Sequence, residues 1–419
     1  MTDLLKDKKI VVGVTGSIAI YKSLELIRLF IKSGAKVKVV MSESAKEFIT
    51  PLTFEAISQN IVLHKESESW ANDNNHIGLA KWADIFTVAP ATANTINKIG
   101  AGIADNLLLE SILAFDKKLL IAPSANTKMY LNPNTTGTIK KLKVFGHEII
   151  EPQSKLLACN DEGLGAMAEP LEIFWRTARE LLKDEFWDNT RVVVTGGGTV
   201  EKIDDVRYIS NFSSGKMAES ISKALYLRGS DVCLITTKDI TNLPSSIYQI
   251  IAQNSKEMLR LTKSSLEVAK KGVMSRPNIT ITQAPKLIQK KPYLFMVAAV
   301  SDFVPAKIKK GKIKKEDMGE IFELELAKNI DILSNIKEEG IKKIGFKVET
   351  NKQKAIENAK KMLNFKNLDA VCLNVIDENN SFGSDSNEIE FINKKRVITL
   401  SKDTKLNISL KILDLAKEL

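Results

Sequence analysis

The sequence predicts an α/β protein built from two doubly wound, Rossmann-like domains. Its 419 residues are enough for two or three domains, each with its own core. A strand–helix–strand pattern with a glycine-containing turn opens the chain, and a second α/β pattern begins near residue 190. We therefore expect one domain over residues 1–185 and another over residues 186–419.

The net charge of +10 is unevenly distributed along the chain. Residues 1–185 contain equal numbers of acidic and basic side chains, so the whole positive excess belongs to residues 186–419. A basic half suits nucleic acid or a phosphate-rich small molecule equally well, but the aromatic residues that single-strand binders place among their basic residues are missing. We expect small-molecule substrates and no nucleic-acid partner.

The three cysteines, Cys159, Cys233 and Cys372, include no CxxC pair. They indicate neither a disulfide framework nor a zinc site, and they fit a reducing compartment. Cys233 and Cys372 fall inside expected strands and are predicted core residues. Because the N-terminus lacks an apolar signal region and no stretch reaches the roughly 20 apolar residues of a membrane helix, we expect a cytoplasmic protein without membrane contact.

The first expected βαβ unit comprises a strand at 9–14, a helix at 18–33 and a strand at 36–41. The turn between the first strand and the helix contains Gly16, where backbone N–H groups could approach a phosphate. Its spacing is not GxGxxG, which argues against a dinucleotide. A mononucleotide such as a flavin and a plain tight turn both remain open.

Further strands are expected at 84–89 and 118–122, separated by a helical stretch at 94–113 that is broken at 100–102. Polar loops follow these strands. In open α/β sheets the ligand lies beyond the carboxyl ends of the strands. The loops at 15–18, 42–44, 90–94 and 123–129 could therefore converge on one cleft.

His76 is expected to open a helix that faces a core. Asparagine and aspartate residues at 72–75 are good N-caps, and Leu79, Ala80 and Ala83 follow His76 at helical spacing. A helix N-terminus disfavours the imidazolium, and a neutral ring could act as a general base. The alternative is a histidine that makes only a local hydrogen bond.

Several motifs in residues 8–170 resemble the flavin-dependent cysteine decarboxylase family: 16–19, 44–51, 76–84, 89–94 and 102–107. The resemblance implies a flavodoxin-like flavoprotein domain with His76 beside the flavin, Asn126 on the substrate carboxylate and Cys159 as proton donor on a flap. Ala125, Asn160 and Ala166 depart from the family pattern. The resemblance further implies that FMN rests on Gly16, Ser17, Ser42, Ala91, Thr92 and Asn94.

The implied chemistry explains why a flavin is needed. Direct loss of CO2 from a cysteinyl carboxylate would leave an unstabilised carbanion, whereas oxidation of the thiol side to a thioaldehyde lets the charge delocalise. Flavin supplies this oxidation and then returns the hydride. His76 would assist proton removal and Cys159 would reprotonate the enethiolate, so the net reaction is redox-neutral.

The second half begins after a helix at 172–183 and an expected connector at 184–190. A strand at 191–194, a glycine-rich turn at 195–199, a helix at 215–228 capped by Ser213 or Ser214, and a strand at 231–236 follow. About 20 residues separate the first strand from its helix. A dinucleotide fold would pass directly from turn to helix, so this loop argues against a Rossmann dehydrogenase.

Four segments of the second half resemble the ligase half of the bifunctional phosphopantothenoylcysteine decarboxylase/phosphopantothenate–cysteine ligase family. They are residues 205–217, the strand at 293–300, the lysine run at 312–315 and the strand at 370–375. An acid after a strand and lysines on a loop suit a Mg2+-bound triphosphate. Ile330, Lys347, Val348 and Met362 depart from the family pattern, and residues 256–291 are longer. The implied ligase residues are Asn211 for the acyl-cytidylate, Lys312 for the phosphates, Asp302 for cytidine or Mg2+, Arg207 and Lys216 for anionic groups, and Ala298, Asp331, Phe346 and Lys366 for the nucleotide.

The resemblance implies a coenzyme A biosynthetic enzyme that uses FMN, Mg2+ and CTP to join 4′-phosphopantothenate to L-cysteine and then decarboxylates the product. It also implies a homo-oligomer, a dodecamer of decarboxylase trimers linked through ligase dimers. The alternatives are a stand-alone cysteine decarboxylase, a flavin prenyltransferase, or a regulatory relative without activity. The motif at 207–217 argues against the first two, and the presence of His76, Asn126 and Cys159 argues against the third.

Overall fold

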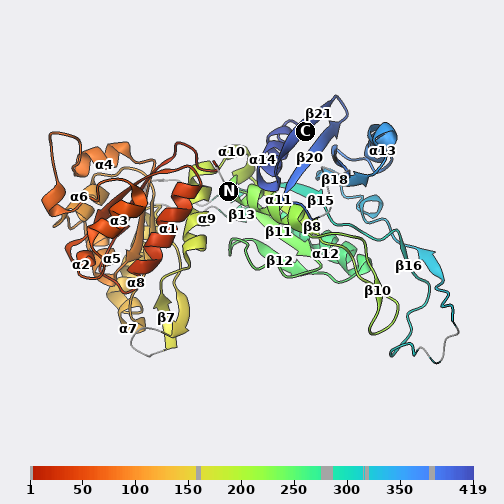
Figure 1. Ribbon diagram of the computed structural model, residues 1–419, viewed down its shortest axis with the longest axis horizontal. Helices are drawn as coiled ribbons and strands as arrows, with labels where there is room; N and C mark the ends of the chain where they lie inside the picture. Colours follow the sequence, from red (N-terminus) through yellow and green to blue (C-terminus); the bar gives the residue numbers. More distant parts are fainter. Residues whose placement is uncertain (1–2, 157–161, 275–285, 315, 317–319, 377–382) are drawn as a thin grey trace. The chain divides into compact units, whose positions relative to one another are not determined.

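The computed structural model describes residues 3–156, 162–274, 286–314, 316, 320–376 and 383–419. The chain forms two compact units, the first built mainly from residues up to Leu182 and the second mainly from residues after it, which are described separately below (Figure 1). Each unit is an α/β structure with a mainly or wholly parallel sheet, as predicted.

The first unit is built on a five-stranded parallel sheet with strand order β2-β1-β3-β4-β5. Strand β3 is buried along its whole length, as expected for a parallel strand covered on both faces. The expected strands at 9–14 and 36–41 are confirmed to the residue. The strands are β1 Lys9–Val14, β2 Lys36–Met41, β3 Ile85–Ala91, β4 Leu119–Pro123 and β5 Glu148–Ile149.

Two sets of helices pack against this sheet (Figure 1). One set contains α1, α3 and α9, and the other contains α4, α5, α6 and α8. The second set closes a core around Val11, Phe86 and Ile121. The helix bounds are α1 Ile20–Lys32, α2 Glu43–Lys46, α3 Pro51–Ser58, α4 His76–Trp82, α5 Ala93–Ala101, α6 Leu107–Leu113, α7 Thr127–Tyr130, α8 Pro133–Val144 and α9 Pro170–Leu182.

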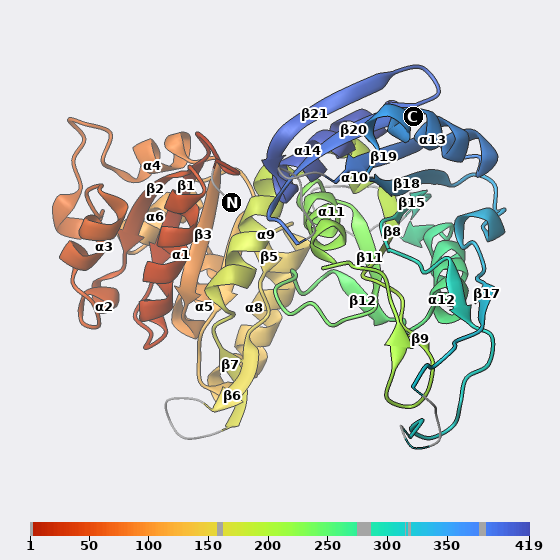
Figure 2. The ribbon, with the colours of Figure 1, turned by 45° about the vertical axis from the view of Figure 1, so that its right-hand side comes forward.

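An antiparallel hairpin of β6 (Gln153–Leu156) and β7 (Glu162–Ala166) follows β5 and precedes α9 in the chain (Figure 2). The backbone N–H of Ala125 donates to the carbonyl of Gly165 at 3.0 Å, which ties the hairpin to the loop after β4. A Cβ atom at Gly165 would lie 2.1 Å from the Ala125 oxygen, so only glycine permits this approach. Cys159 and Asn160 lie outside the described residues.

The second unit is built on an eight-stranded sheet with order β12-β11-β8-β15-β18-β19-β20-β21. Neighbouring strands are parallel from β12 to β19, and the last two pairings are antiparallel. The expected strands at 231–236 and 370–375 are confirmed to the residue. The strands are β8 Thr190–Gly196, β11 Asp231–Thr236, β12 Tyr248–Ile251, β15 Lys291–Met296, β18 Lys342–Glu349, β19 Ala370–Val375, β20 Ser386–Asn393 and β21 Val397–Thr404.

Helices also form two sets in the second unit. Helices α11 (Lys216–Leu227) and α14 (Lys405–Ala416) pack on each other, whereas α12 (Ser255–Ala269) and α13 (Lys352–Phe365) share a core cluster with the strands (Figure 2). Gly215, in a left-handed conformation with φ of 75°, occupies the N-cap position of α11. The expected cap by Ser213 or Ser214 is therefore wrong, since the Ser214 hydroxyl lies only at the 3.5 Å limit from the Lys216 N–H.

The expected connector at 184–190 is not an open linker. Residues Glu185–Asp188 form a short helix, α10, whose start is capped by the Asp184 carboxylate, and Thr190 already belongs to β8. The Trp187 side chain is fully buried and meets the Tyr293 ring at 5.2 Å. Packing of this aromatic pair makes residues 184–190 part of the second unit.

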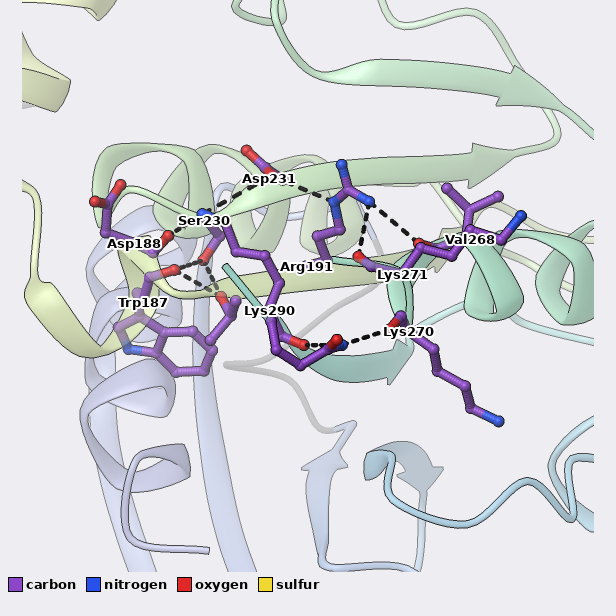
Figure 3. Close-up of polar contacts among 11 residues, drawn as sticks. Trp187, Asp188, Arg191, Ser230, Asp231, Val268, Lys270, Lys271 and Lys290 are labelled. Atoms are coloured by element: carbon purple, nitrogen blue, oxygen red, sulfur yellow. Dashed lines mark hydrogen bonds and ion pairs between the residues drawn. The ribbon is translucent and has the colours of Figure 1, made fainter. Parts of the chain in front are cut away.

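The amino-terminal edge of the second sheet contacts the carboxyl end of α12 (Figure 3). The Arg191 guanidinium on β8 donates to the carbonyls of Val268 at 3.2 Å and Lys271 at 3.3 Å, at the end of α12. It also meets the Asp231 carboxylate at 3.4 Å. The arginine adds a donor to the Val268 carbonyl, which already accepts the Lys271 N–H at 3.1 Å, and so joins the carboxyl end of α12 to β8.

Among the described residues, no helix combines the length and the apolar character that crossing a membrane requires.

Candidate functional sites

The loops after β1, β3 and β4 converge at the carboxyl edge of the first sheet. The Thr15 hydroxyl donates to the Pro90 carbonyl at 2.7 Å and accepts the Thr92 N–H at 3.1 Å. The Ser17 and Ser124 hydroxyls lie 2.8 Å apart. The predicted convergence of the loops at 15–18, 90–94 and 123–129 is thus observed.

The loop after β2 joins the same edge through Gly16. A Cβ atom on Gly16 would lie 2.6 Å from the Ser44 hydroxyl oxygen and 2.8 Å from the Ser44 carbonyl oxygen. Ser42, immediately after β2, has its hydroxyl 3.3 Å from that of Ser44. Glycine is therefore needed at position 16, because Ser44 leaves no room for a Cβ atom there.

A cavity of about 620 Å³ opens at this edge of the first unit. Ser17, Ser124 and Asn126 contribute polar groups to its wall, and Lys155 and Ala166 contribute from the β6–β7 hairpin. Its volume lies in the range that small-molecule sites occupy. The hydroxyl groups and apolar wall residues suit a phosphate group attached to a flat ring, and charged lysine and glutamate side chains also line the cavity.

The other predicted flavin residues occupy the same edge with different exposure. Ala91 is fully buried and its carbonyl accepts the Ser124 N–H at 2.9 Å, while Thr92 caps α5 by accepting the Thr95 N–H at 3.3 Å. Asn94 is exposed on the first turn of α5. None of these three residues is among those that line the 620 Å³ cavity.

Asn126 lines the cavity, and its side-chain oxygen also accepts the Lys128 N–H at 2.9 Å as the N-cap of α7. This bond fixes the side-chain orientation. Cys159 cannot be placed, but the strands on both sides of its segment, through Leu156 and Ala166, line the same cavity. The predicted roles of Asn126 and Cys159 toward the substrate stay predictions.

His76 begins α4 as predicted, with the Asn75 side chain accepting the Gly78 N–H at 2.9 Å. Leu79 and Ala83 are buried, which confirms the predicted inner face of the helix. The His76 ring is not among the residues that line the 620 Å³ cavity. Its Nδ1 atom lies 3.1 Å from a Glu68 carboxylate oxygen, a partner that the sequence analysis did not predict.

In the second unit, the glycine-rich turn after β8 lies beside the segment after β15. Ala299 N–H donates to Gly197 at 2.9 Å, and Thr199 N–H donates to Ala299 at 3.2 Å. The Ala298 N–H meets the Thr195 hydroxyl at 3.3 Å, and the Asn211 side-chain amide donates to the Val300 carbonyl at 3.0 Å. The predicted Asn211 and Ala298 therefore occupy one edge of this sheet.

The loop at 203–207 is joined to the lysine-rich loop at 309–313. The buried Asp204 carboxylate accepts the Val206 N–H at 2.8 Å, the Arg207 N–H at 2.6 Å and the Ile313 N–H at 3.1 Å, and it pairs with the Arg207 guanidinium at 3.1 Å. Arg207 also donates to the Ile313 carbonyl at 3.2 Å. The structure thus brings the predicted Arg207 close to Lys312.

The motif that carries the resemblance begins at residue 205, so the sequence did not point to Asp204, although a carboxylate directly before that motif was the available signal. Burial opposes ionisation of Asp204, but the N–H donors of Val206, Ile313 and Arg207 outweigh this effect and hold its pKa below the usual value. A charged, fully bonded carboxylate is a strong anchor between two loops.

The remaining predicted ligase residues form separate groups. Lys216 pairs with Asp385 at 2.6 Å, and Lys366 pairs with Asp331 at 2.8 Å. Burial opposes ionisation of Asp331, but the Lys366 and Ser334 hydrogen bonds prevail and lower its pKa. Each of these lysines already has an anionic partner, which a bound nucleotide would have to replace or share.

A smaller cavity of about 110 Å³ in the second unit is lined by Phe346, Gly197 and Ser214. Of the predicted ligase residues, Phe346 alone is among those that line it. Asp302 is exposed, and within the described part of the chain it does not belong to a cluster of three potential metal ligands. The structure therefore does not unite all predicted ligase residues in one cavity.

The two unpaired cysteines of the described chain differ in burial. Cys372 on β19 is fully buried and burial raises its pKa, as expected of a core thiol. Cys233 on β11 is only half-buried and contacts the Ser265 hydroxyl at 3.7 Å. The core prediction is confirmed for Cys372 and is too strong for Cys233.

Both units have recognised relatives. Residues 2–181 match the family described as Flavoprotein, and residues 187–276 and 279–419 match the DNA/pantothenate metabolism flavoprotein C-terminal domain. The coenzyme A biosynthesis bifunctional protein CoaBC of Borreliella burgdorferi is 34% identical over 411 residues, 97% of this chain and 98% of that protein. The Haemophilus influenzae protein of the same name is 36% identical over 409 residues, 97% of this chain and 96% of that protein.

Among solved structures, the FMN binding protein AtHal3 is 36% identical and covers 42% of this chain and 97% of its own, with a TM-score of 0.38. The family matches define the class: a flavoprotein α/β unit followed by a pantothenate-metabolism α/β unit in one polypeptide. The chain belongs to the CoaBC family of bifunctional enzymes of coenzyme A biosynthesis. A match over both halves contradicts the stand-alone alternatives.

Proposed function

We propose that this chain ligates 4′-phosphopantothenate to L-cysteine with CTP and then decarboxylates the product to 4′-phosphopantetheine. In the ligation, CTP would lose pyrophosphate to form an acyl-cytidylate, and the cysteine amine would displace CMP. The observation that carries the proposal is the similarity to one bifunctional relative over 97% of this chain. The two α/β units agree with it, since each has polar residues at an edge of its own sheet. We propose limits of 1–185 for the decarboxylase and 186–419 for the ligase, and the reducing cytoplasm as the location.

The first unit fits FMN, because its cavity combines hydroxyl donors with apolar wall residues and lies beside the Gly16 turn. Gly16, Ser17 and Ser42 would hold the phosphate, and Ala91, Thr92 and Asn94 would border the ring. Bound FMN would supply a reversible two-electron oxidation of the carbon that bears the substrate thiol. Asn126 would hold the substrate carboxylate, His76 would accept the thiol proton and Cys159 would return a proton.

A second copy of the chain would complete the decarboxylase site. His76 is not among the residues lining the cavity that contains Asn126, so a single unit leaves the proposed base away from the proposed substrate pocket. A trimer in which His76 of one copy faces the cavity of another would unite them. We propose that such trimers are joined by ligase dimers into a dodecamer.

In the ligase unit, Asn211 would hold the acyl-cytidylate, Arg207 and Lys216 would bind anionic groups, and Lys312 would neutralise the leaving pyrophosphate. Asp302 would bind cytidine or the Mg2+ that accompanies CTP. Ala298, Asp331, Phe346 and Lys366 would frame the nucleotide. Asp204 would act through Arg207 and the Lys312 loop rather than by touching substrate.

Replacement of Gly16 by alanine is expected to abolish tight FMN binding. The added Cβ would meet Ser44 at 2.6–2.8 Å, so the loops must separate, at a cost of about 1–3 kcal/mol in unfolding free energy. Absorbance near the flavin bands of the purified protein measures the cofactor content. Gly137→Ala is the matched control, because nothing lies within 4 Å of that Cβ.

Full FMN content in Gly16→Ala, or equal loss in Gly137→Ala, would contradict the assignment of the Gly16 turn to the cofactor. A wild-type protein that binds no FMN when it is supplied in excess would contradict the flavin proposal itself.

A further inference from the structure

Three ionisable side chains outside the 620 Å³ cavity form a cluster at the start of α4. The His76 Nδ1 atom lies 3.1 Å from a Glu68 oxygen and 3.9 Å from a Glu110 oxygen. The Trp70 ring meets the His76 ring edge to face, with centroids 5.5 Å apart. The first distance is a hydrogen bond and the second is too long for one, so Glu68 alone can orient the imidazole.

The loop that carries Glu68 is folded back against α4 by several independent contacts. The Ser69 N–H donates to the Asn74 carbonyl at 2.9 Å, and Asn75 caps the helix through the Gly78 N–H. A Cβ atom on Gly78 would lie 2.0 Å from the Asp73 carbonyl oxygen, so only glycine allows the loop to lie this close to α4. The Glu68–His76 contact therefore lies in a turn that hydrogen bonds hold in place, and it does not join two freely moving surface side chains.

We propose that Glu68 is a positioning residue for His76 in the decarboxylase reaction. Its carboxylate accepts the Nδ1–H of His76, which fixes the tautomer and leaves Nε2 as the nitrogen that accepts a proton. The inference rests on the proposed function of His76. In the proposed oxidation the substrate S–H bond would break as an Nε2–H bond forms on His76, and FMN, when bound, would accept the hydride of the adjacent carbon.

The test compares Glu68→Ala and Glu68→Gln holoenzymes on supplied phosphopantothenoylcysteine. We expect Glu68→Ala to lower the decarboxylation kcat by roughly ten- to a hundredfold, the range seen when a metal-bound histidine loses its outer partner, with KM changed less than about twofold. Glu68→Gln should lose less, since its amide oxygen can still accept the Nδ1–H. FMN absorbance should be unchanged in both.

Two readouts separate positioning from a general structural role. A crystal structure of the Glu68→Ala holoenzyme should show the His76 ring without a single fixed orientation. Glu66→Ala is the matched control, because Glu66 makes the same kind of contact to His64, Nδ1 to carboxylate oxygen at 2.6 Å, on the same loop. It should decarboxylate at the wild-type rate, as should Glu110→Gln.

The proposal is overturned if Glu68→Ala retains the wild-type kcat while His76→Asn is inactive, or if Glu66→Ala loses as much as Glu68→Ala. It is also overturned if a chelator abolishes decarboxylation, because the three side chains would then serve as metal ligands. An active His76→Asn variant would instead refute the proposed role of His76 itself.

Discussion

The Asn211→Asp protein is expected to lose CTP-dependent ligation by roughly a hundred- to a thousandfold, the range seen when one donor to a developing charge is removed. The Asn211 amide donates to the Val300 carbonyl at 3.0 Å, at the edge where the turn after β8 meets the segment after β15. An ionised carboxylate has no proton to donate there and would face an acceptor. It would also add negative charge beside the acyl-cytidylate. The rate of CMP release measures the effect.

Decarboxylation of supplied phosphopantothenoylcysteine should remain at the wild-type rate in Asn211→Asp. Asn60→Asp is the matched control, since Asn60 donates to the Val37 carbonyl at the same 3.0 Å in the first unit. Its ligation rate should be unchanged. Equal loss of both activities in Asn211→Asp would contradict two independent sites.

The Asp204→Asn protein is expected to lose about a hundredfold in kcat/KM for CTP, because small displacements of charge-bearing groups can cost that much. The amide cannot accept all the N–H groups that the carboxylate satisfies, and its NH2 group would face the Val206, Arg207 or Ile313 donors. The Lys312 loop and Arg207 should then lose their common anchor. Steady-state ligation kinetics provide the measurement.

The same substitution predicts a pH-dependent stability difference. The folded-state pKa of Asp204 lies below the usual value, so its contribution is present above the unfolded pKa of about 3.9 and is lost as the pH falls through the folded value. Thermal unfolding of wild type and Asp204→Asn should therefore differ at pH 7 and converge in acid. A stability difference that stays constant with pH would contradict the anchor. So would an equally large ligation loss in Asp205→Asn, because Asp205 accepts only the Gly311 N–H among the bonds of the described residues.

The sheets were predictable because their strands are short apolar runs flanked by turn residues. Strands β1, β2, β11 and β19 match the predicted ranges to the residue. The failures lie where tertiary contacts decide the local structure. Burial of Trp187 against Tyr293 turns an expected linker into α10, and the left-handed Gly215 replaces the expected serine cap of α11.

The candidate sites were predictable where loops follow adjacent strands, as for Ser17 and Asn126, since strand order alone brings these loops together. Glu68 and Asp204 could not be identified in this way. Glu68 approaches His76 through a folded-back loop, and Asp204 reaches Ile313 across 109 positions of the chain. Sequence spacing carries no signal for the Glu68 contact, and the one signal for Asp204 was its place directly before the motif at 205–217.

The most direct test of a bifunctional chain follows both products in one reaction. Purified protein would be incubated with 4′-phosphopantothenate, carboxyl-labelled L-cysteine, CTP and Mg2+. We expect labelled CO2 and CMP in equal amounts, with Asn211→Asp abolishing both and His76→Asn abolishing CO2 alone. Release of AMP from ATP in place of CMP, or CMP without CO2 from the wild-type protein, would contradict the account.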